Sequence, residues 1–273
     1  MAVSNDLGKD APLAELRPPT SLELFLYQLA RMAVVGLCRA LWGLEVVGRE
    51  NAPLQGAFVV APVHRSYIDT LVVAGVSKRR LRYMGKASVW KYRPIGWALS
   101  VLGGFPVRRG SADREAMRRG VEALAGGEPL VLFPEGTRRS GAKVEELFDG
   151  AAFIAIRAQV PILPVGIAGS DAAYPPGARL PRRAKVRVVI GKPIPPPPLA
   201  GGRHVPRQAT RELTAKLHEA LQDLFEQAQI GAGPKAPHGL SSWSRLSVLG
   251  RNKRQRANVS ALPAQPDEPA PPA

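Results

Sequence analysis

Residues 58–69 read FVVAPVHRSYID, an apolar run that ends in a histidine, with an aspartate five positions further on. The apolar half, Phe58 to Val63, predicts a buried strand, and the run from Thr70 to Val73 predicts the apolar start of a helix. His64 is therefore predicted to lie where a strand of an α/β sheet ends and a helix begins. Functional groups of α/β proteins often occupy this position.

His64 and Asp69 together predict a general base. A carboxylate that folds back onto an imidazole fixes one tautomer and leaves the other ring nitrogen free to accept a proton. A structural alternative is that Ser66 and Asp69 form a helix capping box, because they have the required spacing. That alternative does not account for His64, which precedes the cap. On the sequence alone both interpretations stay open.

Residues 133–138, which read FPEGTR, follow a second apolar run that predicts another buried strand. Glu135 and Arg138 would then emerge at the carboxyl end of a strand beside the one that carries His64. Arginine side chains and exposed backbone N–H groups suit a phosphomonoester, and an arginine pair at 108–109 could complete such a site. The alternative is a tight turn that carries solvated charges.

The rest of the chain alternates between the two kinds of pattern. Strands are predicted at 57–63, 129–133, 160–167 and 185–190, and helices at 21–44, 66–76, 112–125, 144–158 and around 213–225. Residues 78–84 are interpreted as a basic connector and 103–106 as a turn. Strands separated by helices indicate an α/β fold with a mostly parallel central sheet flanked by helices.

Composition divides the chain into four predicted parts. These are a disordered lead-in at 1–20, an amphipathic helix at 21–44, an α/β domain at 45–230 and a disordered, basic and Pro-rich tail at 231–273. The lead-in lacks the basic and apolar pattern of a secretory signal. The single cysteine, Cys38, excludes an internal disulfide and is expected to be a small buried hydrophobe.

The charge balance is unusual: 38 Lys and Arg against 22 Asp and Glu give a net charge of +16. Such a surplus predicts attraction to polyanions, namely nucleic acid, an anionic membrane surface or phosphorylated substrates. Nucleic acid is the least favoured of the three and is not expected as a partner, because aromatic residues are only 6% of the chain and no nucleic-acid-binding motif is present.

The helix at 21–44 has a broad apolar face, whose members include Leu22, Phe25 and Leu29. Arg31 and Arg39 interrupt its apolar run, which argues against a spanning helix. We expect an interfacial helix that places the protein on the cytoplasmic face of the cell membrane as a peripheral protein. The alternative is a helix packed on its own domain. The basic cluster at 251–256 predicts either a further contact with anionic lipid or a solvated tail.

Other catalytic patterns are absent from the sequence. The chain has no G-x-S-x-G elbow, no Walker A loop and no G-x-G-x-x-G after a strand. No His/Cys/Asp spacing suggests zinc, and His204, His218 and His238 are expected at the surface. Neither a metal nor a cofactor is expected.

Four blocks in order carry a resemblance. They are His64-x4-Asp69, GGFPVRR at 103–109, FPEGTR at 133–138 and VPILPV at 160–165. With these blocks the chain resembles the glycerolipid acyltransferase family, most closely the bacterial 1-acyl-glycerol-3-phosphate acyltransferases.

The resemblance implies transfer of a fatty acyl group from acyl-CoA or acyl-ACP to the sn-2 hydroxyl of 1-acyl-glycerol-3-phosphate, a lysophospholipid, giving phosphatidic acid. His64 would deprotonate the hydroxyl and Asp69 would orient the ring. The residues implied for the glycerol-phosphate end are Arg109, Glu135, Gly136, Thr137 and Arg138. The alternatives are another acceptor, glycerol 3-phosphate or a different lysolipid, and a non-catalytic protein that binds membrane surfaces. Acyl carrier protein is a partner only if it is the donor.

Overall fold

The computed structural model describes residues 18–86, 90–107, 113–199 and 204–232. The strands are β1 Glu45–Val47, β2 Val59–Pro62, β3 Arg82–Lys86, β4 Gly104–Val107, β5 Leu130–Val131, β6 Ile162–Ala168 and β7 Arg187–Ile190. The helices are α1 Ser21–Trp42, α2 Asp69–Val73, α3 Arg93–Val101, α4 Asp113–Ala125, α5 Gly150–Ala158, α6 Ser170–Ala173 and α7 Arg207–Ala232, with a 3-10 turn, η1, at Arg49–Asn51.

The strands form one mixed sheet in the order β1-β7-β6-β2-β5-β3-β4. From β6 to β4 all neighbours are parallel, whereas β7 runs antiparallel to β6, and β1 runs parallel to β7. The prediction of an α/β fold with a mostly parallel sheet is confirmed. Because β2 and β5 are parallel neighbours, the segments that follow them leave the sheet at the same end, where both strands have their carboxyl ends.

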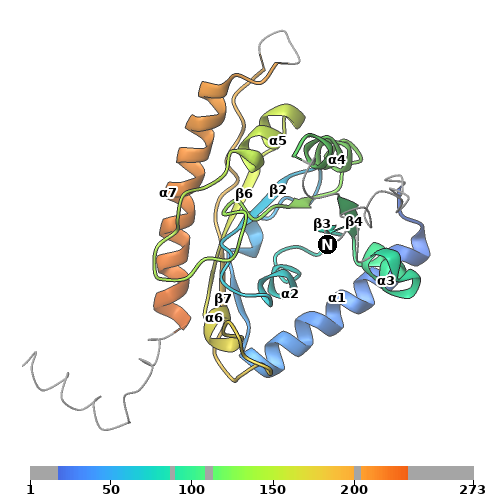
Figure 1. Cartoon of the computed structure of the whole chain (residues 1–273), viewed down its shortest axis with the longest axis vertical. Coiled ribbons are helices and arrows are strands. Elements are labelled where there is room, and N and C mark those ends of the chain that lie inside the picture. Colours follow the sequence, from blue (N-terminus) through green and yellow to red (C-terminus); the bar gives the residue numbers. More distant parts are fainter. Residues whose placement is uncertain (1–17, 87–89, 108–112, 200–203, 233–273) are drawn as a thin grey trace, which may run out of the picture. The chain divides into compact units, whose positions relative to one another are not determined.

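Helices cover both faces of the sheet (Figure 1). Successive side chains of a strand point to opposite faces, and in β2 Val59 and Ala61 enter the core shared with α4, α5 and α7, while Val60 enters the core shared with α1 and α2. The long helix α7 lies directly on β6. A Cβ on Gly166 would come within 2.4 Å of the Leu224 carbonyl oxygen, so only glycine permits this contact.

Helix α1 begins at a capping box formed by Thr20 and Glu23 and ends at Gly43, whose φ of 51° stops the helix. Its buried side includes Cys38 and Trp42, so Cys38 is a buried side chain as predicted. The predicted apolar face lies on the exposed side, with Leu22 at 66% and Phe25 at 65% exposure. By length and composition alone α1 could also cross a membrane, so its peripheral placement stays a prediction.

Several elements differ from the sequence predictions. Residues 82–86 and 104–107 are strands β3 and β4 rather than a connector and a turn, and α3 and β1 were not predicted. The sequence hides β3 because it contains charged residues: Arg82 is buried with its guanidinium over the Phe105 ring at 5.5 Å. Helix α2 spans 69–73 rather than 66–76.

The helix predicted at 144–158 begins only at Gly150. Two backbone N–H groups of the preceding segment bond elsewhere: that of Val144 to the Gln222 side chain and that of Phe148 to the Pro134 carbonyl. Residues 144–149 therefore remain a loop that packs against α7 and the segment after β5. The predicted end of α4 at Gly126 and Gly127 is confirmed, with Gly127 at a φ of 78°.

Candidate active site

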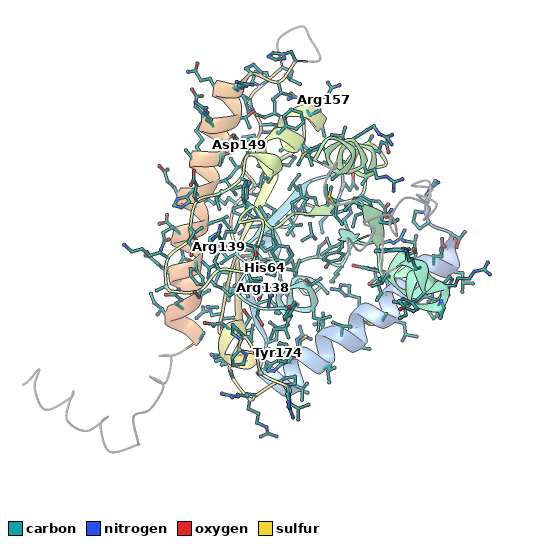
Figure 2. The ribbon with its side chains drawn as sticks, in the orientation of Figure 1. His64, Arg138, Arg139, Asp149, Arg157 and Tyr174 are labelled. Atoms are coloured by element: carbon teal, nitrogen blue, oxygen red, sulfur yellow. The ribbon has the colours of Figure 1, made fainter. Side chains whose placement is uncertain are left out.

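His64 lies in the loop directly after β2, at the carboxyl end of that strand (Figure 2). Its ring nitrogen Nδ1 is 2.9 Å from Asp69 Oδ2. The Asp69 side chain is fully buried, whereas the His64 side chain is 18% exposed. An ionised carboxylate only accepts hydrogen bonds, so this contact places the proton of the neutral ring on Nδ1. Nε2 is then left with its lone pair.

Asp69 also holds the backbone of the same loop. Its Oδ2 accepts from the N–H groups of Arg65 and Ser66, each at 2.6 Å. The capping-box interpretation is therefore correct for Asp69 but wrong for Ser66, whose hydroxyl donates to the Tyr174 carbonyl at 2.9 Å. One buried carboxylate thus shapes the turn and orients the imidazole at the same time.

An aromatic side chain that stacks on His64 fixes the plane of the imidazole. Phe133, which follows β5, stacks on His64 with ring centroids 4.1 Å apart and an interplanar angle of 30°. The ring is therefore held at Nδ1 by Asp69 and across its face by Phe133. Phe133 was not among the predicted site residues, although it begins the FPEGTR block.

Glu135, in the segment after β5, is fully buried. Both of its oxygens lie 2.8 Å from Nη1 of Arg65, and Oε2 also accepts from the His64 backbone N–H at 2.9 Å. Arg65 is almost fully buried, donates through Nη2 to the Lys143 carbonyl at 2.9 Å, and lies over the Phe225 ring at 4.7 Å. The hydrogen-bonding partners of Glu135 are thus groups of the protein itself, and its carboxylate links the segment after β5 to the loop after β2.

The next three residues, Gly136, Thr137 and Arg138, are exposed. Gly136 has a φ of 67°, and a Cβ there would come within 2.6 Å of the Phe148 ring, so the turn requires glycine. The Arg138 guanidinium lies 3.5 Å from the centroid of the Tyr67 ring. Within the described ranges no carboxylate forms an ion pair with Arg138, which leaves its charge available to a ligand.

The segment after β5 is held close to the histidine by a backbone contact, since the N–H of Arg139 donates to the His64 carbonyl at 2.9 Å. The predicted base and the predicted anion-binding loop therefore lie side by side, as Figure 2 shows for His64 and Arg138. Arg109 and its neighbour Arg108 lie outside the described residues. Arg65 and Tyr67, which sequence reasoning missed, stand between His64 and Asp69 in the quoted stretch.

This arrangement suits proton removal from a hydroxyl rather than covalent catalysis. The imidazole is oriented for general-base work, and an unpaired arginine stands beside it to bind an anion. The one cysteine of the chain, Cys38, lies in the core shared with α1 and α2. The site therefore combines a base for an acceptor hydroxyl with a positive charge for an acidic substituent.

Comparison with known proteins gives similar sequences and a similar fold. The family model named Acyltransferase matches residues 43–168. A 1-acyl-sn-glycerol-3-phosphate acyltransferase of Bacillus subtilis is 26% identical over 205 residues, which are 75% of this chain and 97% of the relative. A lyso-ornithine lipid O-acyltransferase of Pseudomonas aeruginosa is 30% identical over 168 residues, 61% of this chain and 64% of the relative.

The chain spans less than half the length of three further 1-acyl-sn-glycerol-3-phosphate acyltransferases, the chloroplastic proteins of Brassica napus and Arabidopsis thaliana and a protein of Chlamydomonas reinhardtii. Among solved structures, the 1-acyl-sn-glycerophosphate acyltransferase PlsC of Thermotoga maritima has a TM-score of 0.60 at 24% identity, with 78% of this chain and 89% of that chain covered. At that identity the likeness concerns the fold.

Proposed function

Because this chain belongs to the acyltransferase family and is an O-acyltransferase, we propose that it acylates the sn-2 hydroxyl of 1-acyl-glycerol-3-phosphate. The product is phosphatidic acid, an intermediate of phospholipid biosynthesis. The observation that carries the proposal is the oriented His64–Asp69 pair beside the unpaired cation of Arg138. A hydroxyl two carbons from a phosphate matches a base that stands next to a positive charge.

In this mechanism Nε2 of His64 removes the proton of the acceptor hydroxyl as the oxygen attacks the thioester carbonyl. Asp69 stabilises the imidazolium that forms. The carbon–sulfur bond of the tetrahedral intermediate then breaks, and the imidazolium returns the proton to the leaving thiolate. An ester and a free thiol result, with no acyl-enzyme. Gly136, Thr137 and Arg138 hold the phosphate, and Arg109 keeps the phosphate-binding role that the resemblance implies.

Glu135 contributes to this mechanism as a positioning residue. Its carboxylate is buried and bonded to Arg65 and to the His64 backbone, so it supports the loop and does not contact the phosphate. This modifies the role that the resemblance implied for Glu135. The other residues of the block keep their predicted role.

An acceptor panel tests the proposal. Purified protein is given one acyl-CoA and, in turn, 1-acyl-glycerol-3-phosphate, glycerol 3-phosphate and lyso-ornithine lipid. The last acceptor is included because of the Pseudomonas relative. We expect kcat/KM to be highest for 1-acyl-glycerol-3-phosphate, since it carries both the phosphate for Arg138 and an acyl chain. A higher value for either of the other acceptors would replace the proposed one.

The variant Arg138→Gln tests, in the same assay, whether Arg138 binds the phosphate of the acceptor. Loss of one charged hydrogen-bonding partner is expected to raise KM for 1-acyl-glycerol-3-phosphate about tenfold, with a smaller effect on lyso-ornithine lipid, which has no phosphate. Arg49→Gln is the matched control, because Arg49 is exposed and follows β1, whose carboxyl end lies at the opposite end of the sheet from His64. An equal effect of the two variants would remove Arg138 from the phosphate site.

We further infer that α1 lies in the interface of an anionic membrane, on the cytoplasmic face. The inference is supported by an exposed apolar stripe, Leu22, Phe25, Leu29 and Met32, at 53% to 66% exposure. The opposite side of α1 is tied to the domain, where Arg31 donates to the Ser77 carbonyl at 2.8 Å. Helix α3, which contacts α1, adds Ile95 and Trp97, at 48% and 64% exposure.

Substitution of the four stripe residues by glutamine is expected to weaken sedimentation with anionic vesicles at least about tenfold, because each fully buried side chain of this kind is worth about 1.5–3 kcal/mol. Substitution is preferable to deletion of residues 1–44, which would uncover the core around Cys38 and Trp42. Leu54→Gln with Leu180→Gln is the control, since both side chains are exposed elsewhere. Unchanged sedimentation of the stripe variant would move the anchor away from α1.

A further inference from the structure

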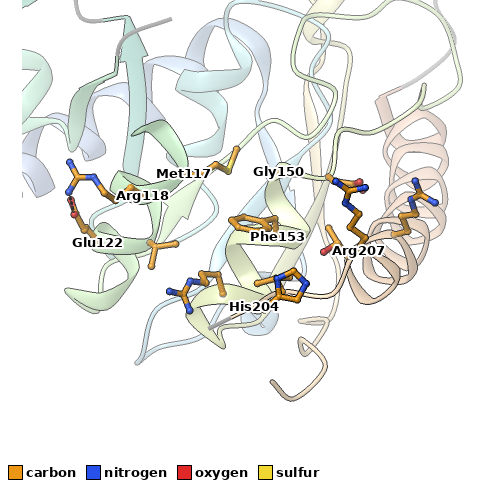
Figure 3. A pocket seen from close by; sticks show the side chains of 13 residues that line it. Met117, Arg118, Glu122, Gly150, Phe153, His204 and Arg207 are labelled. Atoms are coloured by element: carbon orange, nitrogen blue, oxygen red, sulfur yellow. Dashed lines mark hydrogen bonds and ion pairs between the residues drawn. The ribbon is translucent and has the colours of Figure 1, made fainter. Parts of the chain in front are cut away.

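A groove beside the site is not used by the mechanism above. It has a volume of about 890 Å³ and lies between α4, α5 and α7 (Figure 3). Apolar side chains from two of these helices, Met117, Val121 and Phe153, line it. Arg157 of α5 and Arg207 and Arg211 of α7 line the same space. An apolar wall with several cations suits an elongated molecule that carries negative charge.

The groove shares lining residues with a second cavity that extends toward the catalytic site. This second cavity, of about 440 Å³, shares Met117, Asp149 and Gly150 with the groove. The second cavity also reaches Gly136 and Phe133, the ring that stacks on His64. The shared residues stand where α5 begins. A molecule that occupies both cavities would therefore extend from Phe133 past Gly150 and along α5.

The charge of the groove is positive and largely uncompensated. No carboxylate of the described residues lies within ion-pair distance of Arg157, Arg207 or Arg211. Two acids also line the groove. Asp149 accepts a hydrogen bond from the Thr214 hydroxyl at 2.7 Å, and Glu122 is paired with Arg118. The three arginines thus remain available for an anion, while both acids already have partners.

The length of α5, which forms one wall of the groove, is similar to that of the pantetheine arm of a thioester donor. A pantetheine arm has about thirteen bonds from its sulfur to its phosphorus, which at roughly 3.5 Å per three backbone-like bonds spans about 15 Å. The nine residues of α5 span about 14 Å at 1.5 Å per residue. An arm that follows α5 from its first turn would therefore bring its phosphate to the far part of the helix, where Arg157 stands.

Resting on the proposed function, we propose that this groove binds the coenzyme A moiety of an acyl-CoA donor. The thioester lies at His64, the pantetheine arm follows the apolar wall along α5, and the phosphates contact Arg157, Arg207 and Arg211. Coenzyme A is favoured over acyl carrier protein because the cations surround a cavity of small-molecule size. Coenzyme A also carries several phosphate charges, whereas the arm of a carrier protein carries one.

The test measures binding of free coenzyme A by titration calorimetry, so that it does not depend on the acceptor. The full chain carries Arg157→Gln with Arg207→Gln, or the control pair Arg49→Gln with Lys192→Gln. The control pair removes the same charge at exposed positions that follow β1 and β7, at the end of the sheet opposite to His64. We expect Kd to rise at least about tenfold in the groove variant and less than about twofold in the control.

Kinetics give a second readout. In the groove variant KM for acyl-CoA should rise by the same factor, with kcat and KM for the acceptor unchanged. Equal binding of coenzyme A by the groove variant and the control would overturn the proposal. So would wild-type protein that fails to bind coenzyme A but accepts acyl carrier protein as donor. Wild-type binding of coenzyme A without transfer to 1-acyl-glycerol-3-phosphate would count against the proposed acceptor alone.

Discussion

His64→Ala is expected to lower kcat for acyl transfer by about 10²–10⁴-fold, the usual contribution of a general base. Without the imidazole the acceptor hydroxyl has only water to take its proton. The fold should survive, because Asp69 keeps its hydrogen bonds from the backbone of Arg65 and Ser66. The measurement is kcat at saturating acceptor and donor.

Two controls accompany this variant. Vesicle sedimentation and the melting temperature should match those of the wild type, which would exclude unfolding as the cause of the lost activity. His218→Ala removes a histidine of α7 that contacts the Val144 carbonyl, and it should keep most of the activity. A His64→Ala protein whose kcat stays within tenfold of the wild type would show that His64 is not the base.

Glu135→Ala is expected to have the largest effect on stability. It leaves the Arg65 guanidinium buried at 1% exposure without its counter-charge, and breaking a buried pair on one side costs about 3–5 kcal/mol. For a domain of this size that loss corresponds to a decrease in Tm of roughly 6–20 °C. Calorimetry measures the decrease, and activity should fall with it because the loop that carries His64 loses its support.

The double variant Arg65→Met with Glu135→Leu tests the reason for this loss. Apolar residues of similar size often replace a buried pair with little cost, so the double variant should be more stable than Glu135→Ala. Glu145→Ala is the matched control, since Glu145 pairs with Arg139 at the surface and an exposed pair is worth about 0–1 kcal/mol. A Glu135→Ala protein that melts like the control would contradict the role of the buried pair.

The strands that the sequence revealed are those that belong to apolar runs of residues. Strands β2, β5, β6 and β7 are near-continuous apolar runs, which a buried strand requires. Strands β1, β3 and β4 lie towards the two ends of the sheet and contain charged residues or glycine, so they lack that signal. The end of a helix at Gly126 and Gly127 was predictable, whereas the late start of α5 depends on bonds to distant segments.

In the candidate site, likewise, local contacts could be predicted from the sequence and long-range contacts could not. The contact between His64 and Asp69 is local, and its spacing of five residues predicts it. The ion pair between Arg65 and Glu135 joins residues 70 positions apart, and no periodicity in the sequence records such a contact. The family resemblance placed Glu135 among the phosphate ligands, and only the structure shows its contacts with Arg65 and with the backbone of His64. The groove along α5 was missed because its walls come from three separate helices.

The contacts of Glu135 have a consequence for how the enzyme turns over. Its carboxylate holds the segment after β5 to both the side chain of Arg65 and the backbone of His64, so these two stretches move as one body. The base is then preorganised before any lipid arrives, and little reorganisation is needed in the transition state.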